Sequence, residues 1–238
     1  MLFRAVLFDL DGTLLATDFD ELMPSYLQLV SERFAKWVDK EAFIKQLLAS
    51  TQAAMECRDP NFTVLEAFSR DFFPKVGLDR EYLRIFYDFY QKEFKGLGQG
   101  AARREGSREA VDAALERGYK VVVATNPLFP EVAIRERLAW AGLDKVPFAL
   151  ITTGENMHFC KPYSEYYWEI ADLIGCAPRE CLMVGNDPVY DLPAGKIGMK
   201  TFFLGDGPHQ LADYWGDMGA LCRLLDKSGE YKSDVQAY

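Results

Sequence analysis

Short apolar segments alternate with helical patterns along much of the chain, and this alternation constrains the fold more than any other feature. The apolar segments are typical of strands buried on both faces of a sheet, and they lie at 2–8, 121–124, 148–151, 181–184 and 201–204. Apolar residues recur at helical spacing in 107–117, 130–141 and 163–174, and Gly118, Gly142 and Gly175 follow these three segments. Such alternation predicts right-handed βαβ crossovers. We therefore predict an α/β fold, with a Rossmann-like parallel sheet sandwiched by helices.

One long stretch interrupts this alternation. Between Leu14 and Gly106 no segment is typical of a strand, and apolar residues such as Leu22, Tyr26 and Val30 recur at helical spacing. The pattern predicts a helical insert after the first strand. We expect an α/β core domain of residues 1–15 and 106–238, and a helical domain of residues 16–105.

Composition and charge exclude several classes of function. The chain has 238 residues, with 27 Lys and Arg, 36 Asp and Glu, and a formal net charge of −9. This acidic balance argues against binding to nucleic-acid backbones and against adsorption to anionic membranes. No apolar run reaches the roughly 18 to 20 residues of a membrane span. The five cysteines form no CxxC pair, which favours reduced thiols in a cytoplasmic protein.

Polar residues follow the predicted strands, where ligands bind in an open parallel sheet. Asp9 and Asp11 follow the first strand, and Thr125 and Asn126 follow segment 121–124. Lys161 lies before the helix at 163–174, and segment 181–184 leads to Asp187 and Asp191. In the predicted parallel sheet, these acids, the threonine and the lysine converge on one edge.

That set of residues suits phosphoryl chemistry on a divalent cation. Neighbouring carboxylates repel by roughly 4 kcal/mol at 4 Å and an effective dielectric of ~20, and a cation removes this cost. The chain has only two histidines, too few for a histidine-based metal site. A metal would therefore be bound by oxygen ligands, which suit Mg²⁺. Of Asp9 and Asp11, one carboxylate can act as nucleophile and the other as general acid and base. Thr125 and Lys161 suit phosphoryl oxygens.

Each element also has a simpler interpretation when it is taken alone. The acids at 9 and 11 could begin a calcium-binding loop, but Leu14 stands where that loop needs glycine and a strand precedes them. They could also lie in a solvated turn, and Lys161-Pro162 could be a surface loop. The prediction therefore rests on the order of the elements and on their positions after strands.

These motifs together resemble the haloacid dehalogenase-like (HAD) hydrolase superfamily. The resemblance rests on Phe8-Asp9-Leu10-Asp11-Gly12-Thr13-Leu14, Val123-Ala124-Thr125-Asn126, Lys161-Pro162 and Val184-Gly185-Asn186-Asp187-Pro188-Val189-Tyr190-Asp191. Their order and spacing match from about residue 3 to residue 204. The helical insert is similar to the family's α-helical cap of the first type.

The resemblance implies a role for each motif. Asp9 would form an aspartyl-phosphate, and Asp11 would protonate the leaving group and then activate water. Thr125, Asn126 and Lys161 would bind the phosphoryl group. Mg²⁺ would bind the Asp9 carboxylate, the Asp11 backbone carbonyl and an acid of the fourth motif. The family's dehalogenases lack the second acid of the first motif, so Asp11 favours phosphoryl transfer.

The fourth motif departs from the commoner pattern, because Asn186 stands where an aspartate usually follows the glycine. We expect Asp187 to be the metal ligand there, with Asp191 as the second choice.

The leading hypothesis is a Mg²⁺-dependent phosphatase of a small phosphorylated metabolite. A phosphomutase acting on a sugar phosphate would use the same residues. A non-catalytic module that binds Mg²⁺ or a phosphorylated ligand is a third possibility, although both Asp9 and Asp11 are present. A receiver-type signalling domain is disfavoured by the length and by the helical insert. The physiological substrate and the oligomeric state stay open.

Overall fold

The structure is a computed structural model that describes residues 3–17 and 19–226. These residues form a six-stranded sheet in the order β3-β2-β1-β4-β5-β6, and every neighbouring pair is parallel. The strands are β1 (Ala5–Phe8), β2 (Lys120–Val123), β3 (Leu150–Ile151), β4 (Cys181–Gly185), β5 (Lys200–Leu204) and β6 (Tyr214–Gly216). The predicted α/β fold is confirmed. The short edge strand β6 was not predicted, and Leu2, where the first predicted segment begins, lies outside the described residues.

The register brings the ends of the central strands level. Phe8, the last residue of β1, pairs with Val123 of β2 on one side and with Val184 of β4 on the other. The residues that follow these three strands therefore share one edge of the sheet. This is the carboxyl edge, at which the predicted site residues were expected.

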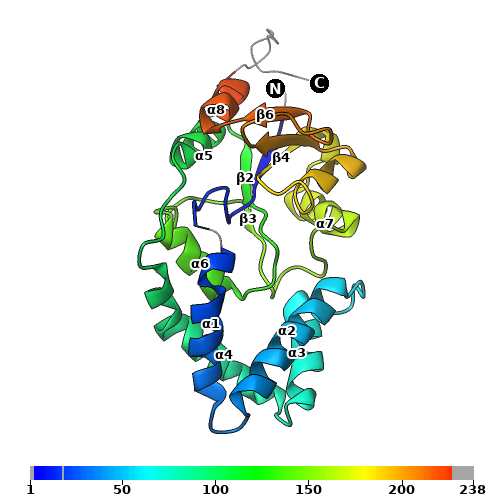
Figure 1. The fold of residues 1–238 in the computed structure, drawn as a ribbon. Coiled ribbons are helices and arrows are strands. Elements are labelled where there is room, and N and C mark those ends of the chain that lie inside the picture. Colours follow the sequence, from blue (N-terminus) through cyan, green and yellow to red (C-terminus); the bar gives the residue numbers. More distant parts are fainter. Residues whose placement is uncertain (1–2, 18, 227–238) are drawn as a thin grey trace.

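Helices cover both faces of the sheet, as Figure 1 shows. Val6 and Phe8 pack with α5 (Ser107–Glu116), α6 (Glu131–Trp140) and α8 (Met218–Asp226), whereas Ala5 and Leu7 pack with α7 (Ser164–Ile174). Successive side chains of β1 point to opposite faces, so a continuously apolar strand is buried on both. Two short 3₁₀ helices, η3 (Pro178–Glu180) and η4 (Leu192–Ile197), flank β4.

The described part of the stretch between β1 and α5 contains helices joined by loops and no named strand. It contains α1 (Phe19–Phe34), α2 (Lys40–Glu56), α3 (Val64–Lys75), η1 (Arg80–Tyr82), α4 (Leu83–Lys92) and η2 (Phe94–Gly98). We call residues 19–98 the helical insert. Its own core consists largely of aromatic rings, including Phe34, Phe43, Phe72 and Phe86. The predicted insert is confirmed, and the domain boundaries near residues 16 and 105 stay a prediction.

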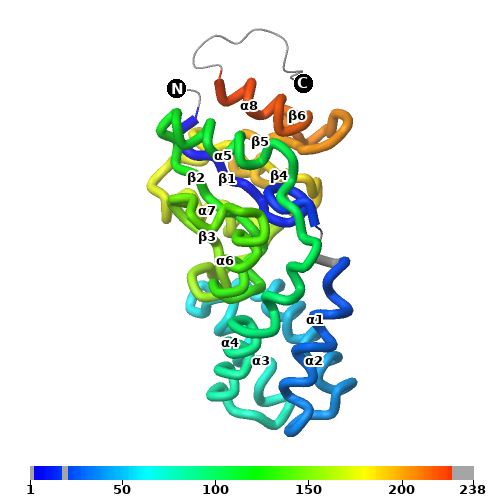
Figure 2. Tube along the Cα trace, turned by 90° about the vertical axis from the view of Figure 1, so that its left-hand side faces the viewer, coloured from blue at the N-terminus to red at the C-terminus, as the bar shows by residue number. Residues whose placement is uncertain are grey.

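The helical insert packs on one end of the α/β part, as Figure 2 shows from a second direction. Ala133 of α6 belongs to the aromatic core of the insert. At the start of α3, the backbone N–H of Val64 donates to the Met157 carbonyl and that of Leu65 to the Gly154 carbonyl, each at 2.8 Å. The insert is therefore fixed both to α6 and to the loop before α7.

The two linkers of the insert run side by side. The N–H of Ala16 donates to the Ala102 carbonyl at 2.8 Å, and the N–H of Arg104 donates to the Leu14 carbonyl at 3.1 Å. All five cysteines lie within the described residues and are free thiols, as predicted. In the same part of the chain no helix has the length and apolar character needed to cross a membrane. The cytoplasmic location stays a prediction.

Candidate active site

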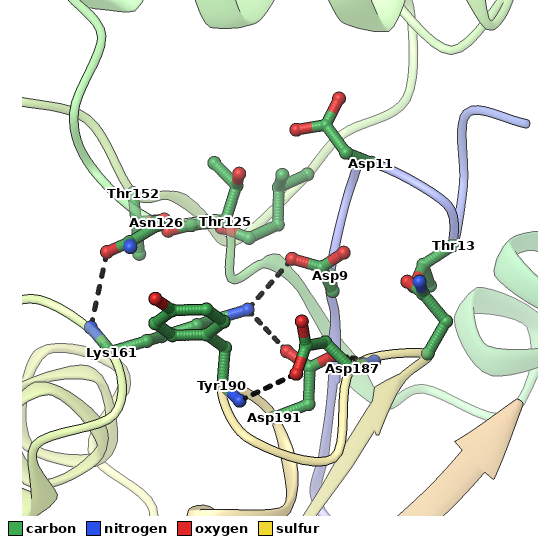
Figure 3. Close-up of polar contacts among 12 residues, drawn as sticks. Asp9, Asp11, Thr13, Thr125, Asn126, Thr152, Lys161, Asp187, Tyr190 and Asp191 are labelled. Atoms are coloured by element: carbon green, nitrogen blue, oxygen red, sulfur yellow. Dashed lines mark hydrogen bonds and ion pairs between the residues drawn. The ribbon is translucent and has the colours of Figure 1, made fainter. Parts of the chain in front are cut away.

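Three of the predicted residues meet at the carboxyl edge of the sheet, as Figure 3 shows. Lys161 Nζ donates to Asp9 Oδ1 at 2.8 Å and to Asp191 Oδ1 at 2.6 Å. The side chains of Lys161 and Asp191 are each 1% exposed, and that of Asp9 is 13% exposed. The structure thus places a buried cation between two carboxylates that come from opposite ends of the sequence.

Burial and charge act against each other in this triad. Burial by itself lowers the pKa of Lys161, but the carboxylates of Asp191 and Asp9 outweigh it and raise that pKa well above its ordinary value. Burial also raises the pKa of Asp191, an effect that the ammonium of Lys161 opposes. Lys161 is therefore a fixed positive charge beside Asp9.

Thr125 and Asn126 follow β2 and lie beside the triad (Figure 3). Thr125 is buried, and its backbone carbonyl accepts hydrogen bonds from Thr152 Oγ1 and Tyr166 Oη, both at 2.7 Å. The side-chain oxygen of Asn126 accepts a hydrogen bond from the backbone N–H of Lys161 at 3.2 Å. Asn126, predicted to bind substrate, thus holds the backbone that carries Lys161.

The two acids of the fourth motif differ in how many of their oxygens are engaged. Asp187 accepts hydrogen bonds from the N–H groups of Val189 at 2.7 Å and Tyr190 at 3.1 Å, both on Oδ1. Asp191 uses both oxygens, because Oδ1 contacts Lys161 and Oδ2 accepts from the N–H of Asp187 at 2.9 Å. Asp187 therefore keeps more capacity for an additional ligand.

Asp11 does not join the triad. In Figure 3 its carboxylate points away from Asp9. Its Oδ2 forms an ion pair with Arg137 of α6, whose side chain is 1% exposed. Burial lowers the pKa of Arg137 to about 10, so its guanidinium stays protonated near neutral pH.

The turn between Asp11 and Thr13 requires glycine. Gly12 has φ +71°, and a Cβ at this position would lie 2.5 Å from the side-chain nitrogen of Asn186. Thr13 Oγ1 donates to Asn186 Oδ1 at 2.8 Å. Asn186, the residue at which the motif departs from the commoner pattern, thus packs against the first motif and fixes its turn.

Two adjacent tyrosines of α7 support the loops that follow β2 and β4. The Tyr166 hydroxyl donates to the Thr125 carbonyl, and the Tyr167 hydroxyl donates to the Tyr190 carbonyl. In the sequence these rings were predicted only as the apolar face of a helix. Their neighbours across the chain could not be read from spacing.

Arg137 was not predicted as a site residue, although its position in the sequence indicated a buried charge. It stands three residues after Ile134 and one before Leu138, both of which are buried. An arginine on the apolar face of a helix is rarely left without a charged partner. The position of Arg137 among the apolar residues of segment 130–141 therefore indicated a buried ion pair.

Solved structures share this architecture. A HAD phosphatase from Thermococcus onnurineus matches with a TM-score of 0.58 and 22% identity, over 94% of this chain and 98% of that one. The HAD-hydrolase YfnB from Bacillus subtilis, described as bound to magnesium, matches with a TM-score of 0.55 and 19% identity, over 95% and 100%. At these identities the likeness concerns the fold alone.

Sequence relatives match over most of their length. The pyrimidine 5'-nucleotidase PynA of Streptococcus pneumoniae is 29% identical over 226 residues, which cover 90% of this chain and 88% of that protein. The pyrophosphatase PpaX of Halalkalibacterium halodurans is 28% identical over 205 residues, covering 85% and 83%. Residues 3–197 match the model of the haloacid dehalogenase-like hydrolases. The chain belongs to this family and is a hydrolase of it.

Proposed function

We propose that the chain is a Mg²⁺-dependent phosphatase of a small phosphorylated metabolite, acting through an aspartyl-phosphate on Asp9. The observation that carries this proposal is the buried ammonium of Lys161, 2.8 Å from Asp9 Oδ1. A fixed cation at the carboxyl edge offsets the negative charge of an arriving phosphoryl group. The names of the relatives, a nucleotidase and pyrophosphatases, support phosphate-ester or anhydride hydrolysis.

The reaction needs two steps on the same phosphorus atom. In the first, an Asp9 carboxylate oxygen bonds to phosphorus, the ester P–O bond breaks, and the leaving oxygen takes a proton from Asp11. In the second, water attacks the phosphorus while Asp11 accepts its proton. The bond from phosphorus to Asp9 then breaks, which releases inorganic phosphate and restores the Asp9 carboxylate.

Lys161, Thr125 and Asn126 serve the phosphoryl group in different ways. The ammonium of Lys161 attracts phosphoryl oxygens and holds Asp9 in place for attack. Thr125 supplies a hydroxyl at the same edge of the sheet, and its backbone carbonyl is held by Thr152 and Tyr166. Asn126 acts through the backbone of Lys161, because its side-chain oxygen accepts the Lys161 N–H.

The donors at this edge are carboxylate and carbonyl oxygens, the type that Mg²⁺ prefers, although within the described residues no three acidic, histidine or cysteine side chains are grouped closely enough to hold a metal ion by themselves. We assign the Asp9 carboxylate, the Asp11 backbone carbonyl and the Asp187 carboxylate as ligands. Asp187 is preferred over Asp191 because both Asp191 oxygens are already hydrogen-bonded, one of them to Lys161. When bound, Mg²⁺ supplies positive charge that stabilises the phosphoryl oxygens.

The leaving group of the substrate is expected to contact the helical insert. A small cavity of about 40 Å³ lies between the insert and the segment after β2, and its lining includes Tyr26, Thr51, Tyr87 and Leu128. All its lining side chains are uncharged, although several carry hydroxyl groups.

A phosphatase assay with para-nitrophenyl phosphate tests the reaction. We expect hydrolysis with Mg²⁺, its loss with EDTA, and a fall in kcat of at least ~10³-fold in Asp9→Asn, because an amide is a poor nucleophile. Asp112→Asn, at an exposed ion pair of α5, is the matched control and should retain full activity. An active Asp9→Asn enzyme, or activity indifferent to EDTA, contradicts the proposal.

A panel of metabolites then tests the substrate class. Nucleoside monophosphates, sugar phosphates and pyrophosphate are compared by release of inorganic phosphate. A phosphatase releases phosphate from its best substrate, whereas an isomeric sugar phosphate as product indicates a phosphomutase.

A further inference from the structure

Arg137 is a charged side chain in an apolar setting. It lies on α6 with a side chain 1% exposed, between the buried residues Ile134 and Leu138. Burying an unpaired charge is strongly unfavourable, so a guanidinium in this position needs a partner. Its partner is Asp11, the acid of the first motif that does not contact Lys161.

The ion pair distinguishes the two oxygens of Asp11. Oδ2 contacts the Arg137 guanidinium. Oδ1 is buried and has no hydrogen-bond partner within the described part of the chain. A carboxylate held by one oxygen has a fixed orientation, and the other oxygen is left for a group that is not part of the protein.

We propose that Arg137 is a positioning residue that holds Asp11 by Oδ2, so that Oδ1 exchanges the proton with the leaving group and with water. This inference rests on the proposed function and adds to it the residue that orients the acid and base. In the first step the proton moves from Asp11 Oδ1 to the leaving oxygen as the P–O bond breaks. In the second it moves from water to Oδ1.

Phe129, in the segment after β2, connects Arg137 to the helical insert. The guanidinium carbon lies 5.5 Å from the ring centre of Phe129. That ring lies 5.8 Å from the ring of Tyr26 and 6.2 Å from that of Tyr90, both in the insert. The position of Asp11 is thereby connected to the docking of the insert on α6.

The dependence of rate on the leaving group tests this role. Para-nitrophenol is a much stronger acid than phenol, so para-nitrophenyl phosphate needs far less protonation than phenyl phosphate, a substrate of similar shape. In Arg137→Met, kcat/KM for phenyl phosphate should fall by ~100-fold and that for para-nitrophenyl phosphate by less than ~10-fold. A merely structural role would lower both to the same extent.

Matched variants make the test specific. Arg135→Met removes an arginine of the same helix that is exposed and paired with Glu131, and both values of kcat/KM should stay unchanged. Arg137→Lys keeps the buried charge but loses the planar guanidinium. We therefore expect a smaller fall in kcat/KM, again larger for phenyl phosphate than for para-nitrophenyl phosphate. This variant decides the question if Arg137→Met does not fold. Equal losses on both substrates, or no loss, in the Arg137 variant that folds overturn the inference.

Asp11→Asn separates this inference from the function on which it rests. It should reproduce the selective loss on phenyl phosphate, and adding Arg137→Met to it should cause little further selectivity. If Asp11→Asn is not selective, or Asp9→Asn stays active, the proposed function fails. If both behave as expected and the Arg137 variants are not selective, only the role of Arg137 fails.

Discussion

The carboxyl edge of the sheet and the interior of the helical insert bury different kinds of side chain. The edge buries the charges of Lys161 and Asp191 side by side, whereas the insert buries aromatic rings such as Phe34, Phe43 and Phe86. Buried ion pairs contribute little net stability or even cost it, because desolvation offsets their attraction. Buried rings stabilise through the apolar area that they remove from water. The comparison indicates that the edge is arranged for chemistry and that packing stabilises the insert.

Substitution of an aromatic ring in the insert should have the largest effect on stability. Phe86 lies 4.7 Å from the ring of Phe34 and 5.7 Å from that of Phe72. Phe86→Ala should lower the free energy of unfolding by about 3–5 kcal/mol, because it leaves a cavity in a packed core. Urea denaturation measures this loss. Leu48→Ala, at an exposed position of α2, is the control and should change it by less than ~0.5 kcal/mol.

At the carboxyl edge, loss of a carboxylate should affect the Mg²⁺ requirement more than the stability. Asp187→Asn should raise the Mg²⁺ concentration for half-maximal activity by ~10- to 100-fold, while the free energy of unfolding changes by less than ~1 kcal/mol. The amide oxygen can still accept the N–H groups of Val189 and Tyr190, so the loop should persist. Asp191→Asn should instead lower kcat with little change in the Mg²⁺ requirement. The reverse pattern assigns the metal to Asp191.

The smallest effect concerns the boundary between the two regions. Cys160, next to Lys161, is buried against Ala54 and Val64 of the insert. Burial raises its pKa to about 12, so near neutral pH the fraction of reactive thiolate is very small, and it grows only as the pH approaches that value. Iodoacetamide should therefore modify the partly exposed Cys57 while Cys160 resists, as mass spectrometry of peptides can measure. Labelling of Cys160 at the rate of Cys57 would mean that the insert does not cover it.

Local patterns sufficed for the elements that pack on both faces of the sheet. The strand at Ala5–Phe8 and the helix at Ser164–Ile174 were predicted because uninterrupted apolar runs and helical spacing, ended by Gly175, have few alternatives. The strand at Tyr214–Gly216 was missed, because three residues at a sheet edge carry no periodicity. Its position depends on pairing with β5, which is a long-range contact.

The candidate site divides in the same way. Asp9 and Lys161 were expected near each other because each lies next to a strand end or helix start in a parallel sheet. The direction of the Asp11 side chain was not predictable, since it depends on Arg137, which is 126 positions later in the chain and on a different element. Asn186 was noted as a departure, and only the structure shows that it packs on Gly12. The edge of the sheet at which polar residues gather can be inferred from sequence, but side-chain partners across elements cannot.

The pair of tyrosines on α7 has a consequence for the precision of the site. Tyr166 holds the loop after β2 and Tyr167 holds the loop after β4, so one helix is the common reference for both. Any small displacement of α7 moves the two loops together and preserves the spacing between them. Thr125 and Asp191 are therefore positioned relative to each other through a single helix, in addition to their own strands.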